Sequence, residues 1–368
     1  MYARDPRVVM TLDAGGTNFV FSATRANTEI VRPVTLPSRA NDLPSCLETI
    51  VNGFEAVRGQ LDAAPTAISF AFPGPADYER GIIGDLNNLP AFRGGVPLGP
   101  FLEARFRVPV FINNDGDLFA YGEALAGALP WVNKLLAEAG KEKRYRNLIG
   151  VTLGTGFGGG VVRDNQLCTG DNGAGAEVWV IRCKRDPRYG VEEGVSIRAI
   201  KREYAALSGD SRDLTPKDIR DIATGALAGN RPAARETFAR AGEVLGDTLA
   251  TINAVVDGVA VIGGGIAKAG ELLMPAAMKA LNGSLETPAG GRTDRMEMKA
   301  FNLDDPEDTA RFLAPSVVSV PVPGTSRRVD YDPVKRMGVM TSRLGTSKAV
   351  ALGAYAFALN KLDKLDGR

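Results

Sequence analysis

The sequence predicts an α/β protein of two domains. Its 368 residues exceed the roughly 100–200 residues of an ordinary domain. Strand-like apolar runs alternate with segments of helical spacing, which is typical of sheets covered by helices on both faces. The order of glycine-rich hairpin, helices, buried strand and turn occurs in both halves of the chain. The plan repeats, although the residues do not, and we therefore expect two domains of similar design.

In the first half, two strands near 7–13 and 18–24 are expected to enclose a glycine turn, because apolar and β-branched residues flank it. Apolar residues at helical spacing predict a helix near 43–61. The other elements expected here are strands at 67–72 and 108–112 and helices at 98–106 and 117–129.

In the second half, a glycine hairpin near 148–162 is followed by a helical region and a buried strand at 259–262. The helices are expected near 196–208, 216–229, 232–254, 268–281 and 349–359.

Two stretches look inserted into this plan. Residues 130–146 are basic, and residues 285–344 are rich in Pro, Gly and charge. We expect an N-terminal α/β domain of residues 1–117 plus 345–368. Residues 118–344, which include both inserts, are expected to form a C-terminal α/β domain.

Composition excludes several classes of function. The 44 basic and 43 acidic residues balance, so nothing favours nucleic acid or an anionic membrane. Three widely spaced cysteines make no disulfide framework, which indicates a reducing, cytoplasmic setting. We expect neither a signal peptide nor a membrane span, because no apolar run of about 18 residues occurs.

The chain contains no histidine. Ser-His-Asp and Cys-His catalysis and a His-ligated zinc site are therefore excluded. Because histidine is the usual general base near neutral pH, a carboxylate is expected to fill that role here.

Two glycine-rich segments are candidate phosphate-binding turns. They are Asp13-Ala14-Gly15-Gly16-Thr17 and Leu153-Gly154-Thr155-Gly156-Phe157-Gly158-Gly159-Gly160. Both are expected to run from strand to strand, whereas a Rossmann or Walker loop runs from strand into helix. Their amides could face a polyphosphate, and Asp13 could hold a hydrated Mg²⁺ there. The alternative is two ordinary hairpins.

Asp115 is the candidate general base. It lies in Asn113-Asn114-Asp115-Gly116-Asp117, directly after a predicted strand, where ligands bind in open α/β sheets. The amide side chains beside it could hold other hydroxyls. Asp115 or Asp117 could instead cap a helix.

Three carboxylates are candidates for contact with sugar hydroxyls, and the first of them, Glu177, comes shortly after the second glycine segment. Glu192 and Glu193 follow later in the chain. Each of these carboxylates could equally be a surface acid. Asn88 follows Asn87 in a polar turn, which by itself indicates only a turn.

Taken together, these motifs resemble the ROK family of repressors, uncharacterised reading frames and sugar kinases. The resemblance runs from about residue 8 to residue 358 outside the inserts, with the motifs in the family's order. It rests on Asp13-Ala14-Gly15-Gly16-Thr17, Pro73-Gly74-Pro75, Asn88-Leu89-Pro90, Asn114-Asp115, residues 153–160, Glu177 and Gly263-Gly264-Gly265. It implies a two-domain actin-like ATPase (ribonuclease H-like) fold, shared with hexokinases, with a ligand cleft between the domains. It also implies phosphoryl transfer from ATP, with Mg²⁺, to a hexose hydroxyl.

By position, the resemblance implies a role for each matched residue. Asp115 matches the catalytic base. The sugar contacts are matched by Asn88, Asn114, Glu177 and Glu192, with Glu193 as a rival for the last. The nucleotide contacts are matched by Asp13, Gly15, Gly16, Thr17, Thr155, Gly156, Gly158, Gly264 and Gly265. The last two of these lie on the adenosine side, and Asp13 would hold Mg²⁺ through water.

One stretch departs from the family pattern. The family follows its Glu with Ile-Gly-His and a cysteine cluster that holds zinc, whereas Glu177 is followed by Val178-Trp179-Val180 and Cys183 stands alone. We therefore expect no structural zinc site. Val180 stands where the family has the histidine that also contacts the sugar, so this resemblance implies the loss of one hydrogen-bond partner. A sensor that binds sugar or nucleotide without turnover is the alternative to an enzyme.

Repressors of this family carry a winged helix before the first hairpin, whereas this chain enters its first strand almost at once. We therefore expect hexose and ATP as partners, and neither nucleic acid nor membrane, and we leave a homodimer open.

Overall fold

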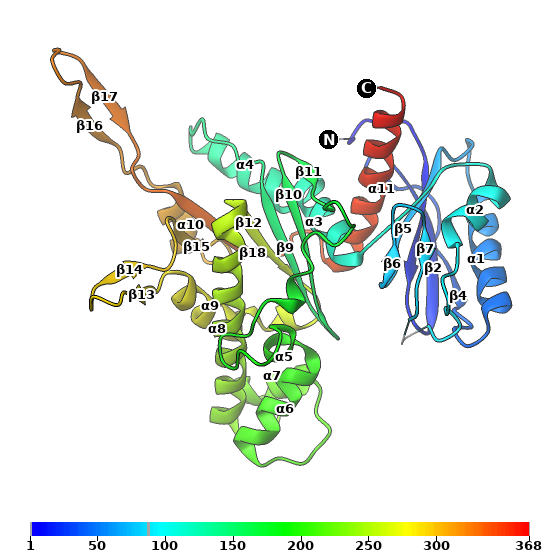
Figure 1. Cartoon of the computed structure of the whole chain (residues 1–368), viewed down its shortest axis with the longest axis horizontal. Helices are drawn as coiled ribbons and strands as arrows, with labels where there is room; N and C mark the ends of the chain where they lie inside the picture. Colours follow the sequence, from blue (N-terminus) through cyan, green and yellow to red (C-terminus); the bar gives the residue numbers. More distant parts are fainter. Residues whose placement is uncertain (1, 87–88, 368) are drawn as a thin grey trace. The chain divides into compact units, whose positions relative to one another are not determined.

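The computed structural model describes residues 2–86 and 89–367, and its contacts divide the chain into two compact units (Figure 1). The first unit comprises the chain up to Gly127, Gly159–Ala176 and the chain from Arg343 onward. The second unit comprises Ala128–Gly158 and Glu177–Ser342. No helix among the described residues is long and apolar enough to cross a membrane.

The first unit contains a sheet whose strands follow the order β3-β2-β1-β5-β8, with β4 paired to β2. The strands are β1 (Val9–Ala14), β2 (Asn18–Arg25), β3 (Thr28–Glu29), β4 (Val34–Pro37), β5 (Ala67–Ala71) and β8 (Val110–Asn113). β1, β5 and β8 run parallel, so their carboxyl ends share one edge. A small hairpin, β6 (Ala76–Asp77) and β7 (Ile82–Ile83), follows β5.

Helices cover both faces of this sheet. They are α1 (Leu43–Arg58), α2 (Leu98–Phe106), α3 (Asp115–Ala126) and α11 (Thr346–Leu365). Met10 of β1 belongs to the core formed with α1 and α2, which includes Phe54. Val9 points to the opposite face, where it packs with Tyr355 of α11. The alternation along β1 therefore produces the layered α/β architecture that the sequence predicts.

The helices α3 and α11 cross at very close range. A Cβ on Gly122 would overlap the backbone of Ala349, and a Cβ on Gly353 would overlap the backbone of Leu118. This packing places residues 118–127 in the first unit, although the sequence assigns them to the C-terminal domain. The contact-based units therefore differ from the predicted domains at this point.

The second unit is built on four parallel strands in the order β9-β12-β18-β15. They are β9 (Leu148–Leu153), β12 (Val259–Gly263), β18 (Arg336–Thr341) and β15 (Lys299–Asn302). The chain passes into the first unit within β10 (Phe157–Arg163), which continues there as an antiparallel hairpin with β11 (Gln166–Leu167). Residues 159–176 thus also lie outside the unit to which the sequence assigns them.

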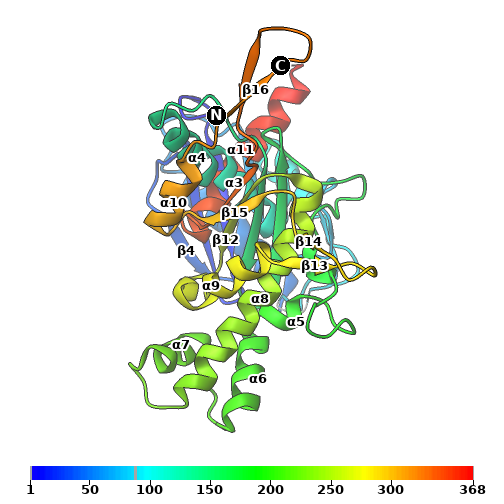
Figure 2. The ribbon, with the colours of Figure 1, turned by 90° about the vertical axis from the view of Figure 1, so that its left-hand side faces the viewer.

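Helices surround the sheet of the second unit, and α6 and α7 pack beside one end of the long α8 (Figure 2). They are α4 (Ala128–Glu138), α5 (Glu192–Val195), α6 (Ile197–Ser208), α7 (Pro216–Thr224), α8 (Arg231–Val256), α9 (Gly270–Leu281) and α10 (Pro306–Leu313), with the 3-10 helices η1 (Val178–Val180) and η2 (Ile266–Ala269).

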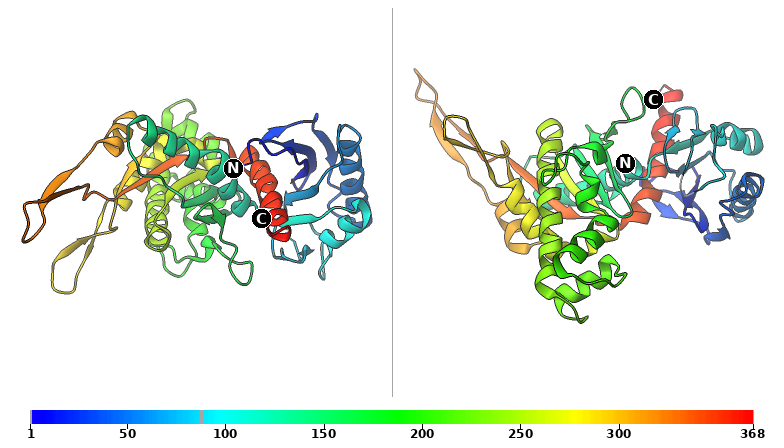
Figure 3. Two further views of the ribbon diagram at one scale, coloured as in Figure 1. Left: turned by 90° about the horizontal axis from the view of Figure 1, so that it is seen from above. Right: turned by 60° about the horizontal axis from the view of Figure 1, so that its bottom comes forward.

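The stretch 285–344 is not an insert as a whole. It supplies β15 and β18 to the sheet, and both strands carry buried side chains such as Phe301 and Val339. The exposed parts are two hairpins that extend as ribbons (Figure 3): β13 (Ser284–Glu286) with β14 (Arg292–Asp294), and β16 (Val318–Pro321) with β17 (Arg328–Tyr331). The polar residues of these hairpins dominate the composition of the stretch, and its short core strands were therefore not recognised from the sequence.

Candidate functional site

The first glycine segment is the turn between β1 and β2, as predicted. The Gly15 amide donates to the Asn18 carbonyl at 3.1 Å, and a Cβ on Gly15 would lie 2.8 Å from that oxygen. Ser38 holds the other side of the turn, donating its hydroxyl to the Gly16 carbonyl at 2.6 Å and its amide to the Thr17 carbonyl at 2.9 Å. Gly16 and Thr17 remain exposed at the carboxyl end of β1. Only glycine fits the close approach at Gly15 without a shift.

The strand register brings Asp13 and Asp115 to the same edge of the first sheet. Asp13 pairs with Ala71, and Ala71 pairs with Asn113 across the next parallel strand. Two strand spacings amount to about 10 Å. Both carboxyls are reached by solvent, yet enough protein surrounds them to remove water and raise the pKa of each. At Asp115, hydrogen bonding to the next amide opposes this effect, and the negative charge of Asp13 adds to it.

Asn114 is the cap of α3. Its Oδ1 accepts from the Gly116 amide at 2.7 Å, and Oδ1 of Asp115 accepts from the same amide at 2.9 Å. The alternative that Asp115 or Asp117 is the cap is therefore wrong, because Asp115 is the first helical residue. Among the described residues, none accepts a hydrogen bond from Nδ2 of Asn114.

Two glycines of the second segment serve packing in the first unit. A Cβ on Gly116 would lie 2.6 Å from the Gly159 carbonyl oxygen, and a Cβ on Gly160 would lie 2.6 Å from the Gly116 carbonyl oxygen. The first turn of α3 therefore lies directly on β10. Gly158, a predicted phosphate contact, is the partly buried strand residue that precedes this contact.

The second glycine turn joins β9 to β10, as predicted. Its tip, residues 154–157, belongs to the second unit. The Gly154 amide donates to the Gly156 carbonyl at 3.0 Å, and Thr155 is exposed at the tip. Gly264 lies beside this turn with a φ of 87°, and a Cβ there would overlap the Leu153 backbone. Gly264 and the turn thus form one cluster.

Glu192 supports this second turn. Its Oε2 accepts from the Phe157 amide at 2.8 Å, and a Cβ on Gly156 would lie 2.6 Å from the same oxygen. Its Oε1 accepts from Arg198 at 2.5 Å, and Arg198 also reaches the Thr155 carbonyl at 3.4 Å. Sequence reasoning missed both contacts, because Phe157 and Glu192 are 35 positions apart and no local pattern links them.

Glu177 lies directly before η1 and beside an exposed indole. Its Oε2 accepts from Nε1 of Trp179 at 2.6 Å, and Trp179 is 46% exposed. The Val191 amide donates to the Ile181 carbonyl at 2.7 Å, which ties this segment to the one that carries Glu192. A carboxylate acceptor beside an aromatic face is suited to a sugar.

The remaining predicted residues have separate outcomes. Asn88 lies outside the described residues. Glu193 accepts from Arg198 and Arg202, and these hydrogen bonds to guanidinium groups hold the pKa of Glu193 below its ordinary range. Gly265 is exposed next to Gly264. Within 2–86 and 89–367, no three His, Cys, Asp or Glu side chains gather in a metal-binding arrangement; the absence of zinc stays a prediction.

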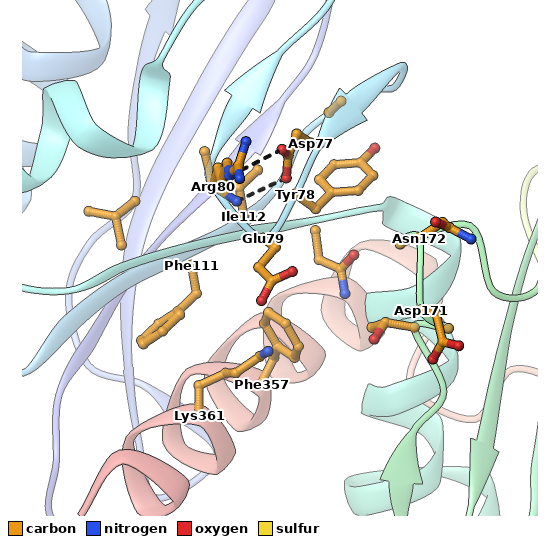
Figure 4. A pocket seen from close by; sticks show the side chains of 16 residues that line it. Asp77, Tyr78, Glu79, Arg80, Phe111, Ile112, Asp171, Asn172, Phe357 and Lys361 are labelled. Carbon is orange, nitrogen blue, oxygen red and sulfur yellow. Dashed lines mark hydrogen bonds and ion pairs between the residues drawn. The ribbon is translucent and has the colours of Figure 1, made fainter.

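A cavity of about 670 Å³ lies in the first unit, bordered by β8, α11 and the β6–β7 hairpin (Figure 4). Phe357 and Lys361 form one wall, and the Asp77–Arg80 ion pair, at 3.8 Å, forms another. The cavity contains none of the predicted site residues, although Asn113 lines it.

Comparison with known proteins adds three findings. The model of the ROK family matches residues 9–296. The crystal structure of a glucokinase from Parabacteroides distasonis is 55% identical and covers 98% of this chain and 99% of that chain, with a TM-score of 0.88. The Thermotoga maritima glucokinase is 29% identical over 71% of this chain and 83% of its own.

A curated relative of different name also matches. The N-acetyl-D-glucosamine kinase of Vibrio vulnificus is 32% identical over 47% of this chain. The match covers 52% of that enzyme, so the chain spans about half the length of this relative. These likenesses confirm the predicted fold class, the actin-like ATPase fold. The ligand cleft and the domain boundaries stay predictions.

Proposed function

Because the chain belongs to the ROK family, we propose that it is an ATP-dependent hexose kinase in which Asp115 is the general base. The names of its relatives, glucokinase and N-acetyl-D-glucosamine kinase, support a sugar kinase. The assignment of catalytic roles rests on the strand register. It brings Asp13, the first glycine turn and Asp115 to one edge of the first sheet. Two carboxylates and a row of open turn backbone at one edge suit phosphoryl transfer.

In this proposal Asp115 accepts the proton of the attacking hydroxyl. Its raised pKa favours the role, because a carboxylate of higher proton affinity is a stronger base. Nδ2 of Asn114 donates to a sugar hydroxyl, and Glu177 and Glu192 accept from others. Trp179 offers its exposed face to the apolar side of the sugar. Holding the hydroxyl in place supplies much of the rate, because phosphoryl transfer leaves little covalent chemistry to the protein.

The nucleotide is assigned to the two glycine turns. In the first unit, the proposed phosphate contacts are Gly15, Gly16 and Thr17. In the second unit, they are Thr155, Gly156 and Gly158, with Gly264 and Gly265 proposed for the adenosine side. Mg²⁺, if bound with ATP, would supply positive charge for the phosphate groups. Asp13 fits it through water, because it is an exposed carboxylate beside the first turn and Mg²⁺ prefers few carboxylates and several waters.

Transfer of labelled γ-phosphate from ATP to a panel of hexoses tests the proposal. The panel contains glucose, mannose, fructose, allose and N-acetylated hexosamines. We expect at least one hexose to be phosphorylated, and Asp115→Ala to lower kcat by roughly 10²–10⁴ while binding of the ATP analogue AMPPNP survives. Phosphate transfer at the parent rate by Asp115→Ala would refute the role of Asp115.

The second candidate is a sensor without turnover. It is favoured by the segment after Glu177, where the carboxylate is engaged by Trp179 and Val180 is 57% exposed. If calorimetry detects hexose and AMPPNP binding but no member of the panel accepts phosphate, the sensor is the better description.

A further inference from the structure

We propose that Glu192 and Arg198 couple hexose binding to nucleotide binding by bracing the second glycine turn. We call this set, Glu192, Arg198 and residues 154–157, the turn brace. The inference rests on the proposed function, because that function assigns the hexose to Glu192 and a phosphate to the turn.

The first observation is that Glu192 shares its carboxylate between the turn and a cation. Oε2 accepts from the Phe157 amide at 2.8 Å, and Oε1 accepts from Nη2 of Arg198 at 2.5 Å. Each carboxylate oxygen has two lone pairs, so each retains one position for a sugar hydroxyl. The side chain is 22% exposed, which leaves it open to a ligand. A hydroxyl bound to Glu192 therefore shares the carboxylate with the turn amide.

The second observation is that the start of α6 holds the same turn from the other side. The Ile197 amide donates to the Gly154 carbonyl at 2.9 Å, and Nη1 of Arg198 reaches the Thr155 carbonyl at 3.4 Å. Three backbone groups of the turn are thus hydrogen-bonded to α6 or to Glu192: the carbonyls of Gly154 and Thr155 and the amide of Phe157. Arg198 is the single side chain that contacts both the turn and Glu192 among the described residues.

The third observation is that Glu193 fixes Arg198 in this position. Nε and Nη2 of Arg198 donate to Oε1 of Glu193 at 2.8 and 2.5 Å. Arg202 then donates to Oε2 of Glu193 at 2.8 Å and to its carbonyl at 2.6 Å. Arg202 is therefore a matched control, because it belongs to the same charge network but in these contacts touches neither the turn nor Glu192.

From these contacts the direction of the coupling follows. A hexose that fixes Glu192 also fixes the Phe157 amide and the tip of the turn, which lowers the entropy that a phosphate loses on binding there. By thermodynamic linkage, the nucleotide favours the hexose by the same factor. Because the brace is partly exposed, we expect a factor near the lower end of the roughly 5–150-fold range that is typical of coupled sites.

The test is calorimetry of Mg²⁺-AMPPNP binding with and without a saturating concentration of the hexose that turns over fastest in the panel. In the parent protein the hexose should lower the Kd of AMPPNP at least about fivefold. In Arg198→Ala this ratio should fall to about one, and in Arg198→Lys it should recover only in part, because lysine keeps the charge but loses the fork. Arg202→Ala should keep the parent ratio.

Circular dichroism melting identifies any variant that is misfolded, and Arg198→Lys then serves in place of Arg198→Ala. A parent that phosphorylates a hexose but shows a ratio of one overturns the coupling and leaves the kinase function standing. Retention of the parent ratio in Arg198→Ala also overturns it. A parent that binds neither AMPPNP nor any hexose overturns the proposed function itself, and the coupling with it.

Discussion

Adding one methyl group at Gly156 should weaken nucleotide binding, whereas the same change at Gly154 should not. A Cβ on Gly156 would lie 2.6 Å from Oε2 of Glu192, while a Cβ on Gly154 meets no atom within 4 Å. Neither glycine has a φ in the left-handed region. The cost at Gly156 therefore arises from the contact with Glu192 and not from backbone strain.

The size of the effect follows from the displacement that the methyl group forces. To reach an ordinary contact distance of 3.4 Å, the Glu192 carboxylate must withdraw by about 0.8 Å. Its 2.8 Å hydrogen bond from the Phe157 amide would then exceed hydrogen-bond length. A hydrogen bond to a charged group contributes about 1.5–3 kcal/mol. Water recovers part of this at a site that is 22% exposed, so we expect the turn to be held about 1.5 kcal/mol less firmly. A nucleotide that binds the ordered turn must supply this free energy, which corresponds to roughly a tenfold rise in Kd.

The assay is calorimetry of Mg²⁺-AMPPNP with the parent, Gly156→Ala and Gly154→Ala, with melting temperatures as a check on folding. Gly156→Ala should bind about tenfold more weakly, and Gly154→Ala should match the parent within about twofold. Equal Kd values for the two variants would refute the reasoning, because it depends entirely on the neighbour of one Cβ.

The other predictions concern the carboxylates, one helix crossing and zinc. Asp115→Asn should abolish most phosphate transfer yet raise the melting temperature at neutral pH, because it removes a carboxylate whose pKa is raised by the loss of water around it and by the charge of Asp13. This gain in melting temperature should vanish at a pH below the pKa of an Asp in the unfolded chain, where the parent carboxyl is protonated in both states. A gain of the same size at that low pH would contradict the reasoning. As the pH is lowered, kcat of the parent should begin to fall at a higher pH than it would with a base of ordinary carboxyl pKa, because Asp115 becomes protonated earlier. A kcat–pH profile measures this. Glu177→Gln should raise KM for the hexose far more than KM for ATP in steady-state kinetics. Gly353→Ala should destabilise the fold by several kcal/mol on denaturant unfolding, because its Cβ would overlap the Leu118 backbone; a loss below about 1 kcal/mol would show that the helices separate easily. Metal analysis of protein made without a histidine tag should find no stoichiometric zinc.

Local patterns in the sequence predicted most of the separate elements. The helix at 98–106 matches α2, and the strands on either side of the first glycine turn lie within one or two residues of the prediction at 7–13 and 18–24. These features depend on spacing and turn chemistry within a short window. The same windows predicted that both glycine segments join strand to strand, as the structure shows. The family resemblance added the fold class, since the order of the motifs is itself a property of the sequence.

Only the tertiary structure decided which residues meet. The support of the second turn by Glu192 and Arg198, and the packing of Gly116 on Gly159, join residues far apart in the chain. The short strand β15 shows no alternation of its own and becomes part of the sheet only through its pairing with β18. Such contacts depend on strand order, on register and on how closely two backbones approach, and no short window of sequence carries that information.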